Sequence, residues 1–195
     1  MSPPTTTDRI LDSAETLFFT DGIAVTGVDR VAASAGVAIA TLYKHVGSKD
    51  GLLEAVLERR LRSWTEHWDA AIEAADSPTD ELLAVFDAVT SFRASAGATQ
   101  WCSFLATASE RPHPPGAGAD PVLDLVDRDT RLVTDRLREL ARSADLDDPQ
   151  AVASSLLLLY NGVLGSLLRG TPDDPVALAR RLALSVVTGS TGRTA

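Results

Sequence analysis

The sequence predicts an all-α protein of about nine helices. Four capping residues each stand directly before a proline, an order typical of a helix start: Ser77-Pro78, Asp120-Pro121, Asp148-Pro149 and Asp174-Pro175. The apolar residues between these starts recur at helical spacing, and no segment alternates as a strand would. The chain has 195 residues, of which 45% are hydrophobic and 23% charged, an ordinary composition for a folded globular protein.

The first predicted helix runs from about Asp8 to Asp21. It carries one apolar face, and Gly22 is suited to end it. The residues of that face are Ile10, Leu11, Ala14, Leu17 and Phe18.

Two short helices follow at the spacing of a helix-turn-helix. The second helix is expected to start at Thr26, because Thr26 and Asp29 have capping-box spacing. Gly36 then turns the chain, and a third helix runs from about Ala38 to His45.

A long fourth helix is expected after Ser48, which is placed to cap it. About 28 residues at a rise of about 1.5 Å each would span roughly 42 Å. Further helices are expected at Pro78 to Ala96 and Thr99 to Ser109, and then from Pro121, Pro149 and Pro175. Proline and glycine mark the segment Arg111 to Gly118 as a loop.

The chain is expected to have two domains of different charge. We predict a helix-turn-helix domain over 1–50 with a disordered tail at 1–6, a larger helical domain over 51–188 and a flexible tail at 189–195. Residues 1–62 carry 7 basic and 8 acidic side chains, whereas residues 63–195 carry 11 and 19. Phosphate binding needs local positive charge, and Thr26 to Lys49 holds three basic residues against Asp29 alone, which permits a nucleic-acid partner but does not identify one.

Several functional classes are disfavoured. The longest apolar run, Leu156 to Tyr160, is too short to span a membrane, and no signal peptide is recognised, so we expect a cytoplasmic protein. The single cysteine, Cys102, permits no internal disulfide. We find no nucleophile elbow and no phosphate loop, and the three histidines are scattered along the chain. We therefore expect no enzyme, no metal and no cofactor.

The segment Thr26 to Leu53 resembles the DNA-binding region of the TetR family of bacterial transcriptional regulators. The resemblance covers roughly the first 55 residues without a gap. It rests on the motifs Ala35-Gly36-Val37, Thr41-Leu42-Tyr43, His45 and Ser48-Lys49-Asp50. Ala38, Ala40 and Val46 depart from the family's usual residues, and Ala38 lacks the side-chain oxygen of a cap.

The resemblance implies that the third helix enters the major groove of DNA. Base-edge contacts would come from Ile39, Ala40, Thr41 and Lys44, and phosphate contacts from Thr26, Tyr43, His45 and Lys49. Lys44 could donate to guanine or to phosphate. Spacing alone allows another interpretation, in which Ile39 and Tyr43 are core residues and Lys49 is a solvated charge.

The resemblance also implies a C-terminal domain that dimerises and encloses a small molecule. The expected ligand contacts are Trp64, Trp68, Phe86, Phe92, Trp101, Phe104 and Tyr160, with Asn161 as a polar anchor. The expected dimer contacts are Leu156, Leu159, Val163, Leu167, Leu178, Leu182, Ser185 and Val186. Both sets could equally be intramolecular core, and Asn161 could set the register of the dimer.

The function expected from this resemblance is a repressor that binds a palindromic operator as a homodimer and is released by a small, largely hydrophobic ligand. Alternatives of the same fold are an activator or a regulator that responds to no ligand. From other classes, a carrier or adaptor remains open, and an enzyme is disfavoured.

Overall fold

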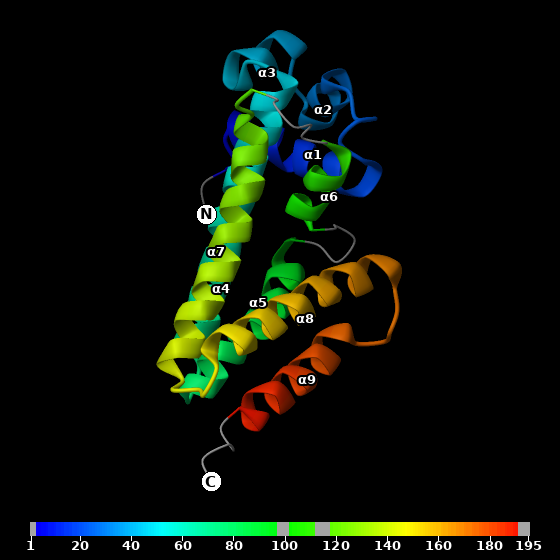
Figure 1. Ribbon diagram of the computed structural model, residues 1–195. Coiled ribbons are helices and arrows are strands. Elements are labelled where there is room, and N and C mark those ends of the chain that lie inside the picture. The colour runs from blue at the N-terminus through cyan, green and yellow to red at the C-terminus, as the bar shows by residue number, and fades with distance from the viewer. Residues whose placement is uncertain (1–2, 97–101, 112–117, 191–195) are drawn as a thin grey trace. The chain divides into compact units, whose positions relative to one another are not determined.

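The computed structural model describes residues 3–96, 102–111 and 118–190, and these ranges form nine helices and no strand (Figure 1). The predicted all-α fold is confirmed. The helices are α1 (Thr6–Asp21), α2 (Val28–Ala35), α3 (Ile39–Val46), α4 (Lys49–Glu73), α5 (Pro78–Ala96), α6 (Ser103–Glu110), α7 (Pro121–Ser143), α8 (Pro149–Arg169) and α9 (Pro175–Gly189).

All four predicted caps before proline are confirmed. Each side chain accepts a hydrogen bond from a backbone N–H in the first turn of its helix: Ser77 from Asp80 at 3.1 Å, Asp120 from Val122 at 3.0 Å, Asp148 from Ala151 at 3.0 Å and Asp174 from Ala177 at 3.1 Å. Proline has no N–H, so it fits the first helical position without loss. Ser48 likewise caps α4 by accepting from the N–H of Gly51 at 2.9 Å.

The predicted capping box of Thr26 and Asp29 is wrong. The helix starts later, with Gly27 at the cap position and no side-chain cap. Thr26 is instead fully buried, and its hydroxyl donates to the carbonyl oxygen of Gly22 at 2.7 Å. The genuine reciprocal cap lies at α1, where Thr5 and Asp8 bond each other's backbone N–H, so this helix begins earlier than predicted.

The chain forms two compact units, and unit 1 comprises residues 1–62 and 99–128. It contains α1 to α3, the first part of α4, α6 and the start of α7. Its apolar core is crossed by an ion network in which Arg59 and Arg60 both bind Glu15, each at 2.5 Å. This network joins the middle of α1 to the middle of α4.

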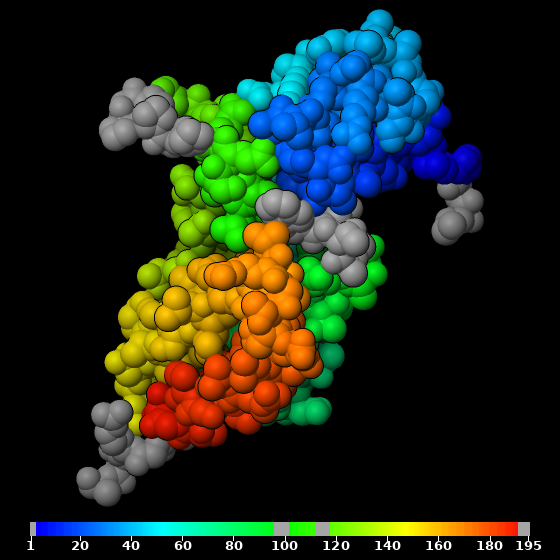
Figure 2. Space-filling view, turned by 90° about the vertical axis from the view of Figure 1, so that its right-hand side faces the viewer, coloured from blue at the N-terminus to red at the C-terminus, as the bar shows by residue number. Residues whose placement is uncertain are grey.

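Unit 2 comprises residues 63–98 and 129–195. The rest of α4 and of α7 packs there with α5, α8 and α9 around one hydrophobic core. The guanidinium of Arg136 on α7 lies 4.8 Å from the ring centre of Trp68 on α4 and also forms an ion pair with Asp69. The helices α8 and α9 lie against each other and share part of the outer surface of this unit (Figure 2).

Helix α8 is unusually apolar for a helix at the surface. Its best 18-residue window has a mean hydropathy of 1.7, which by length and composition would suffice to cross a membrane, although core helices of soluble proteins meet the same criterion. Only 28% of that window is buried within the chain. One face of α8 packs into the core of unit 2, while Leu158 on another face is 74% exposed.

Candidate nucleic-acid interface

The turn between α2 and α3 depends on a glycine. Gly36 adopts the left-handed conformation, with φ 65° and ψ 40°, which side-chain-bearing residues rarely adopt. Its N–H donates to the carbonyl of Ala33 at 3.2 Å, and that of Val37 donates to Ala32 at 3.0 Å. These bonds end α2 and let α3 begin after only a few residues, which is the helix-turn-helix geometry predicted from the sequence.

One side chain of α3 anchors the helix, while its neighbours face outward. Leu42 is fully buried, whereas Ile39 is 46% and Tyr43 is 42% exposed. Residues four apart share one face of a helix, so Ile39 and Tyr43 form one outward surface. The interpretation that both are core residues is therefore wrong, and two large apolar side chains stand in solvent on a short helix.

The remaining predicted residues of α3 lie on or beside this surface. Ala40, Lys44 and His45 are exposed, and Thr41 is half-buried. His45 shares a hydrogen bond of 3.1 Å, from its Nδ1, with the hydroxyl oxygen of Thr7, which ties the end of α3 to the start of α1. Within the described ranges Lys44 has no ion-pair partner, so its charge is available to an anion.

Two of the predicted phosphate contacts are placed differently. The prediction that Thr26 contacts a phosphate is corrected. Thr26 lies in the loop between α1 and α2, and its hydroxyl is buried against the carbonyl of Gly22, so it cannot reach a duplex. Lys49 is half-buried, and its Nζ donates to the carbonyl of Ala24 at 3.2 Å. An ammonium has three donors, so this bond leaves Lys49 capacity for a phosphate.

Comparison with known proteins identifies this arrangement. The family model "Bacterial regulatory proteins, tetR family" matches residues 10–56, which contain the helix-turn-helix. The crystal structure of SCO4454, a TetR-family transcriptional regulator from Streptomyces coelicolor, is 26% identical and superposes with a TM-score of 0.84 over 95% of this chain and 96% of that one. The comparisons identify a TetR-family regulator.

Two curated relatives extend the comparison. The transcriptional repressor KstR2 of Mycolicibacterium smegmatis is 34% identical over 84 residues, so the match spans only 41% of that protein and 43% of this chain. The transcriptional regulator YjdC of Escherichia coli is 26% identical over 182 residues, or 92% of either chain. This TetR-family chain is thus a transcriptional regulator with a helix-turn-helix DNA-binding domain.

The regulator gathers four of the predicted ligand-contact residues into an aromatic cluster in unit 2. The ring of Trp64 lies 5.6 Å from that of Trp68 and 5.8 Å from those of Phe92 and Tyr160. Phe86 is fully buried in the same core. The indole N–H groups of Trp64 and Trp68 are buried and have no hydrogen-bond acceptor among the described residues.

The other predicted ligand residues lie elsewhere. Phe104 is buried in unit 1, and Trp101 lies outside the described residues. Asn161 is exposed on α8, so the prediction that it is the polar anchor of the aromatic cluster is wrong. Its place is the outer face of α8, which agrees with the alternative that it faces another protein chain.

The predicted dimer residues fall into three groups. Leu156 and Val163 are buried in the core of unit 2, so their prediction as interface residues is corrected: the core already covers them. Leu159, Leu167 and Val186 are half-buried at the edge of that core. The rest are exposed, namely Leu178, Leu182 and Ser185, and the structure adds the exposed Leu158, Leu168 and Leu184.

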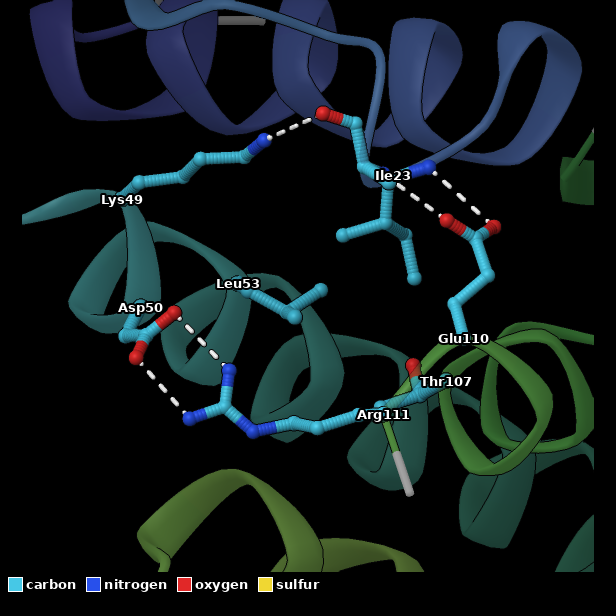
Figure 3. A pocket seen from close by; sticks show the side chains of 8 residues that line it. Ile23, Lys49, Asp50, Leu53, Thr107, Glu110 and Arg111 are labelled. Atoms are coloured by element: carbon cyan, nitrogen blue, oxygen red, sulfur yellow. Dashed lines mark hydrogen bonds and ion pairs between the residues drawn. The ribbon is translucent and has the colours of Figure 1, made fainter.

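A small cavity of about 190 Å³ in unit 1, with both charged and apolar lining residues, was not predicted from the sequence (Figure 3). It lies among the loop after α1, the first turn of α4 and the end of α6. Its lining consists of Ile23, Ala24, Lys49, Asp50, Leu53, Thr107, Glu110 and Arg111. No spacing rule relates residues 49–50 to residues 110–111, so only the folded chain reveals that they meet.

Proposed function

We propose that this TetR-family regulator binds a palindromic operator through the outward face of α3 and acts as a repressor. The observation that carries the proposal is the exposure of Ile39 and Tyr43 beside Lys44, which forms no ion pair with the part of the chain that the structure describes. An apolar side chain at this place can contact a thymine methyl, the tyrosine hydroxyl can donate to a phosphate, and Lys44 can meet a phosphate or a guanine. Repression is favoured because the relative KstR2 is a repressor.

The proposed operator-binding species is a homodimer formed through α8 and α9. Exposed leucines on both helices support it, since large apolar side chains in solvent mark an interaction surface. A Cβ atom placed on Gly162 would meet no atom of the described residues within 4 Å, which leaves room for a closely packed helix. In such a dimer the two copies of α3 would lie about 34 to 36 Å apart, one turn of DNA.

The proposed effector is a small, largely apolar molecule that binds beside the aromatic cluster of unit 2. The unpaired indole N–H groups of Trp64 and Trp68 support one refinement. A buried donor without an acceptor is costly, so a ligand that offers an acceptor oxygen or nitrogen would gain more than a hydrocarbon. Binding there would displace α4 and weaken operator affinity, provided that the ligand prefers the DNA-free state.

Selection of bound duplexes from a random DNA pool tests this function. We expect enrichment of a palindrome whose half-sites are separated by about one helical turn. Tyr43→Ala and Lys44→Ala should weaken binding of the selected duplex by about tenfold or more each, since a charged or base-edge hydrogen bond contributes about 1 to 3 kcal/mol per subunit.

The matched control is Arg131→Ala, which removes one exposed positive charge on α7 of unit 2 and should leave binding nearly unchanged. The proposal is wrong if the selection enriches no DNA sequence, or if the α3 variants bind the selected duplex as tightly as Arg131→Ala does. Enrichment of single half-sites without symmetry would remove the dimeric part alone.

A further inference from the structure

Two adjacent residues at the C-terminal end of α6 meet two adjacent residues in the first turn of α4 around the unit 1 cavity. Glu110 is the last residue of α6 and Arg111 follows it directly, whereas Lys49 and Asp50 open α4 (Figure 3). Figure 3 shows the Lys49 and Glu110 side chains directed to the loop after α1, and the Arg111 side chain directed to Asp50. The loop after α1 forms the third wall through Ile23.

Both backbone polar groups of Ala24, the N–H and the carbonyl, are hydrogen-bonded at this cavity. Its N–H donates to the Glu110 carboxylate at 2.8 Å, and the N–H of Ile23 donates to the same carboxylate at 3.3 Å. Its carbonyl oxygen accepts from the Nζ of Lys49 at 3.2 Å. The loop that leads from α1 into the helix-turn-helix is therefore bonded to α6 and to α4 simultaneously.

Arg111 fixes the neighbouring side of the same junction. Its guanidinium donates two hydrogen bonds of 2.9 Å to the Asp50 carboxylate and one of 2.6 Å to Asp120, the cap of α7. These hydrogen bonds hold the pKa of the Asp50 carboxyl below its usual value, and that of Asp120 likewise. Both carboxylates therefore stay charged through the mildly acidic range, and their hydrogen bonds from Arg111 remain in place there.

We infer that Glu110 is a positioning residue for the DNA-reading surface. Its carboxylate fixes the Ile23–Ala24 backbone, from which α2 and then α3 continue. The inference rests on the proposed function, because α3 is taken as the reading helix. Residue 22, just before this backbone, is a glycine with φ +113°, a conformation that residues with a side chain rarely adopt.

The dimensions of the cavity favour this role over that of an effector site. Its volume of about 190 Å³ lies below the roughly 300 Å³ at which small-molecule pockets usually begin. The four charged side chains around it already bond one another or the backbone. A ligand would have to break those bonds to bind.

Amide hydrogen exchange of the full-length, DNA-free protein tests the inference directly. In Glu110→Ala the amides of Ile23 and Ala24 should exchange about tenfold faster or more, because they lose a charged acceptor. Operator affinity should fall by about tenfold as the loop loosens. Glu110→Gln keeps one acceptor oxygen and should recover part of both losses.

The matched control is Glu58→Ala, at an exposed carboxylate on α4 that has no bonded partner within the described ranges. Both alanine variants remove one negative charge, so electrostatics alone would change DNA affinity equally. Circular dichroism and the melting temperature confirm that each variant is folded at the assay temperature.

Unchanged exchange at Ile23 and Ala24 in Glu110→Ala overturns the inference, and so does operator affinity equal to that of Glu58→Ala. The exchange measurement needs no DNA, so it separates this inference from the proposed function. If the wild-type chain binds no duplex, the proposed function fails while the exchange result still decides whether Glu110 holds the loop.

Discussion

The guanidinium of Arg60 donates to the carboxylate of Glu15 at 2.5 Å, and both side chains are largely withdrawn from solvent. Arg60 also donates to the hydroxyl of Ser103 at 3.0 Å and lies 5.4 Å from the ring centre of Phe19. The buried guanidinium thus has an ion pair, a hydrogen bond and a ring contact. Through them Arg60 connects α4 to α1 and to α6 within unit 1. Removing its carboxylate partner should be far more harmful than removing an exposed one.

We expect Glu15→Ala to lower the free energy of unfolding by about 3 to 5 kcal/mol, because the buried Arg60 guanidinium would lose the carboxylate of Glu15. Asp12→Ala is the control: Asp12 bonds Arg59 at 2.7 Å but is mainly exposed, so its loss should cost at most about 1 kcal/mol. Urea unfolding at one fixed protein concentration measures both. Equal losses for the two variants would contradict the importance of burial at Arg60.

The exposed leucines of α9 predict which side of this helix forms the proposed dimer interface. Leu182 is 48% and Leu184 is 40% exposed, but two residues at about 100° each place them on different sides of the helix. Leu182 shares its side with Leu178 and Ser185. We expect Leu182→Glu to shift the protein to monomers in sedimentation velocity, while Leu184→Glu stays dimeric. The reverse pattern would move the interface to the other side of α9.

The carboxyl of Asp129 is expected to make the free energy of unfolding fall as the pH rises. Burial raises the pKa of its carboxyl to about 7, whereas an aspartate in an unfolded chain has a pKa of about 3.9. Below about pH 4 the group is protonated in both states. As the pH rises to about 7 the unfolded state loses its proton first, so the free energy of unfolding should fall by up to about 4 kcal/mol.

Asp129→Asn should remove that decline and leave a more stable protein above pH 7. Urea unfolding between pH 4.5 and 8 measures the difference, with the exposed Asp127→Asn on the same helix as the control for lost charge. Parallel pH profiles for wild type and Asp129→Asn would show that burial does not perturb this carboxyl.

Lys44 predicts the salt dependence of operator binding. If both copies in a dimer neutralise phosphates, Lys44→Ala should reduce the slope of log K against log salt by about 2, since each contact contributes about 0.9. Binding should weaken similarly for all operator sequences. An unchanged slope with a relaxed preference at one base pair would assign Lys44 to a guanine instead.

Much of the fold could be predicted because its signals are local. Each capping residue before a proline acts on the turn that follows it, so the starts of α5, α7, α8 and α9 needed no knowledge of the tertiary structure. The start of α2 was mispredicted for the same reason. Thr26 has the right spacing to cap a helix, but its hydroxyl bonds the carbonyl of Gly22 behind it, and burial in the folded unit decides between the two.

The partners of each apolar face could not be predicted. Helical spacing indicates that α8 has apolar faces, but it does not distinguish a face that meets α9 from one that meets another chain. Leu156 and Val163 proved to be core, while Leu158, which the sequence did not single out, is the most exposed leucine described. Likewise Glu110 meets Ala24 across 86 positions of sequence, and no periodicity carries that information.

The way α3 is attached has a consequence for how operator preference could diverge among related regulators. Glycines with positive φ, Gly36 and Gly47, flank the helix, and Leu42 is its only fully buried side chain. The outward positions Ile39, Ala40, Tyr43 and Lys44 can therefore be exchanged together, as one cassette, at little cost in folding, as long as these three residues and the contact of His45 with Thr7 remain. Retargeting this regulator to a new half-site should require changes to the cassette alone.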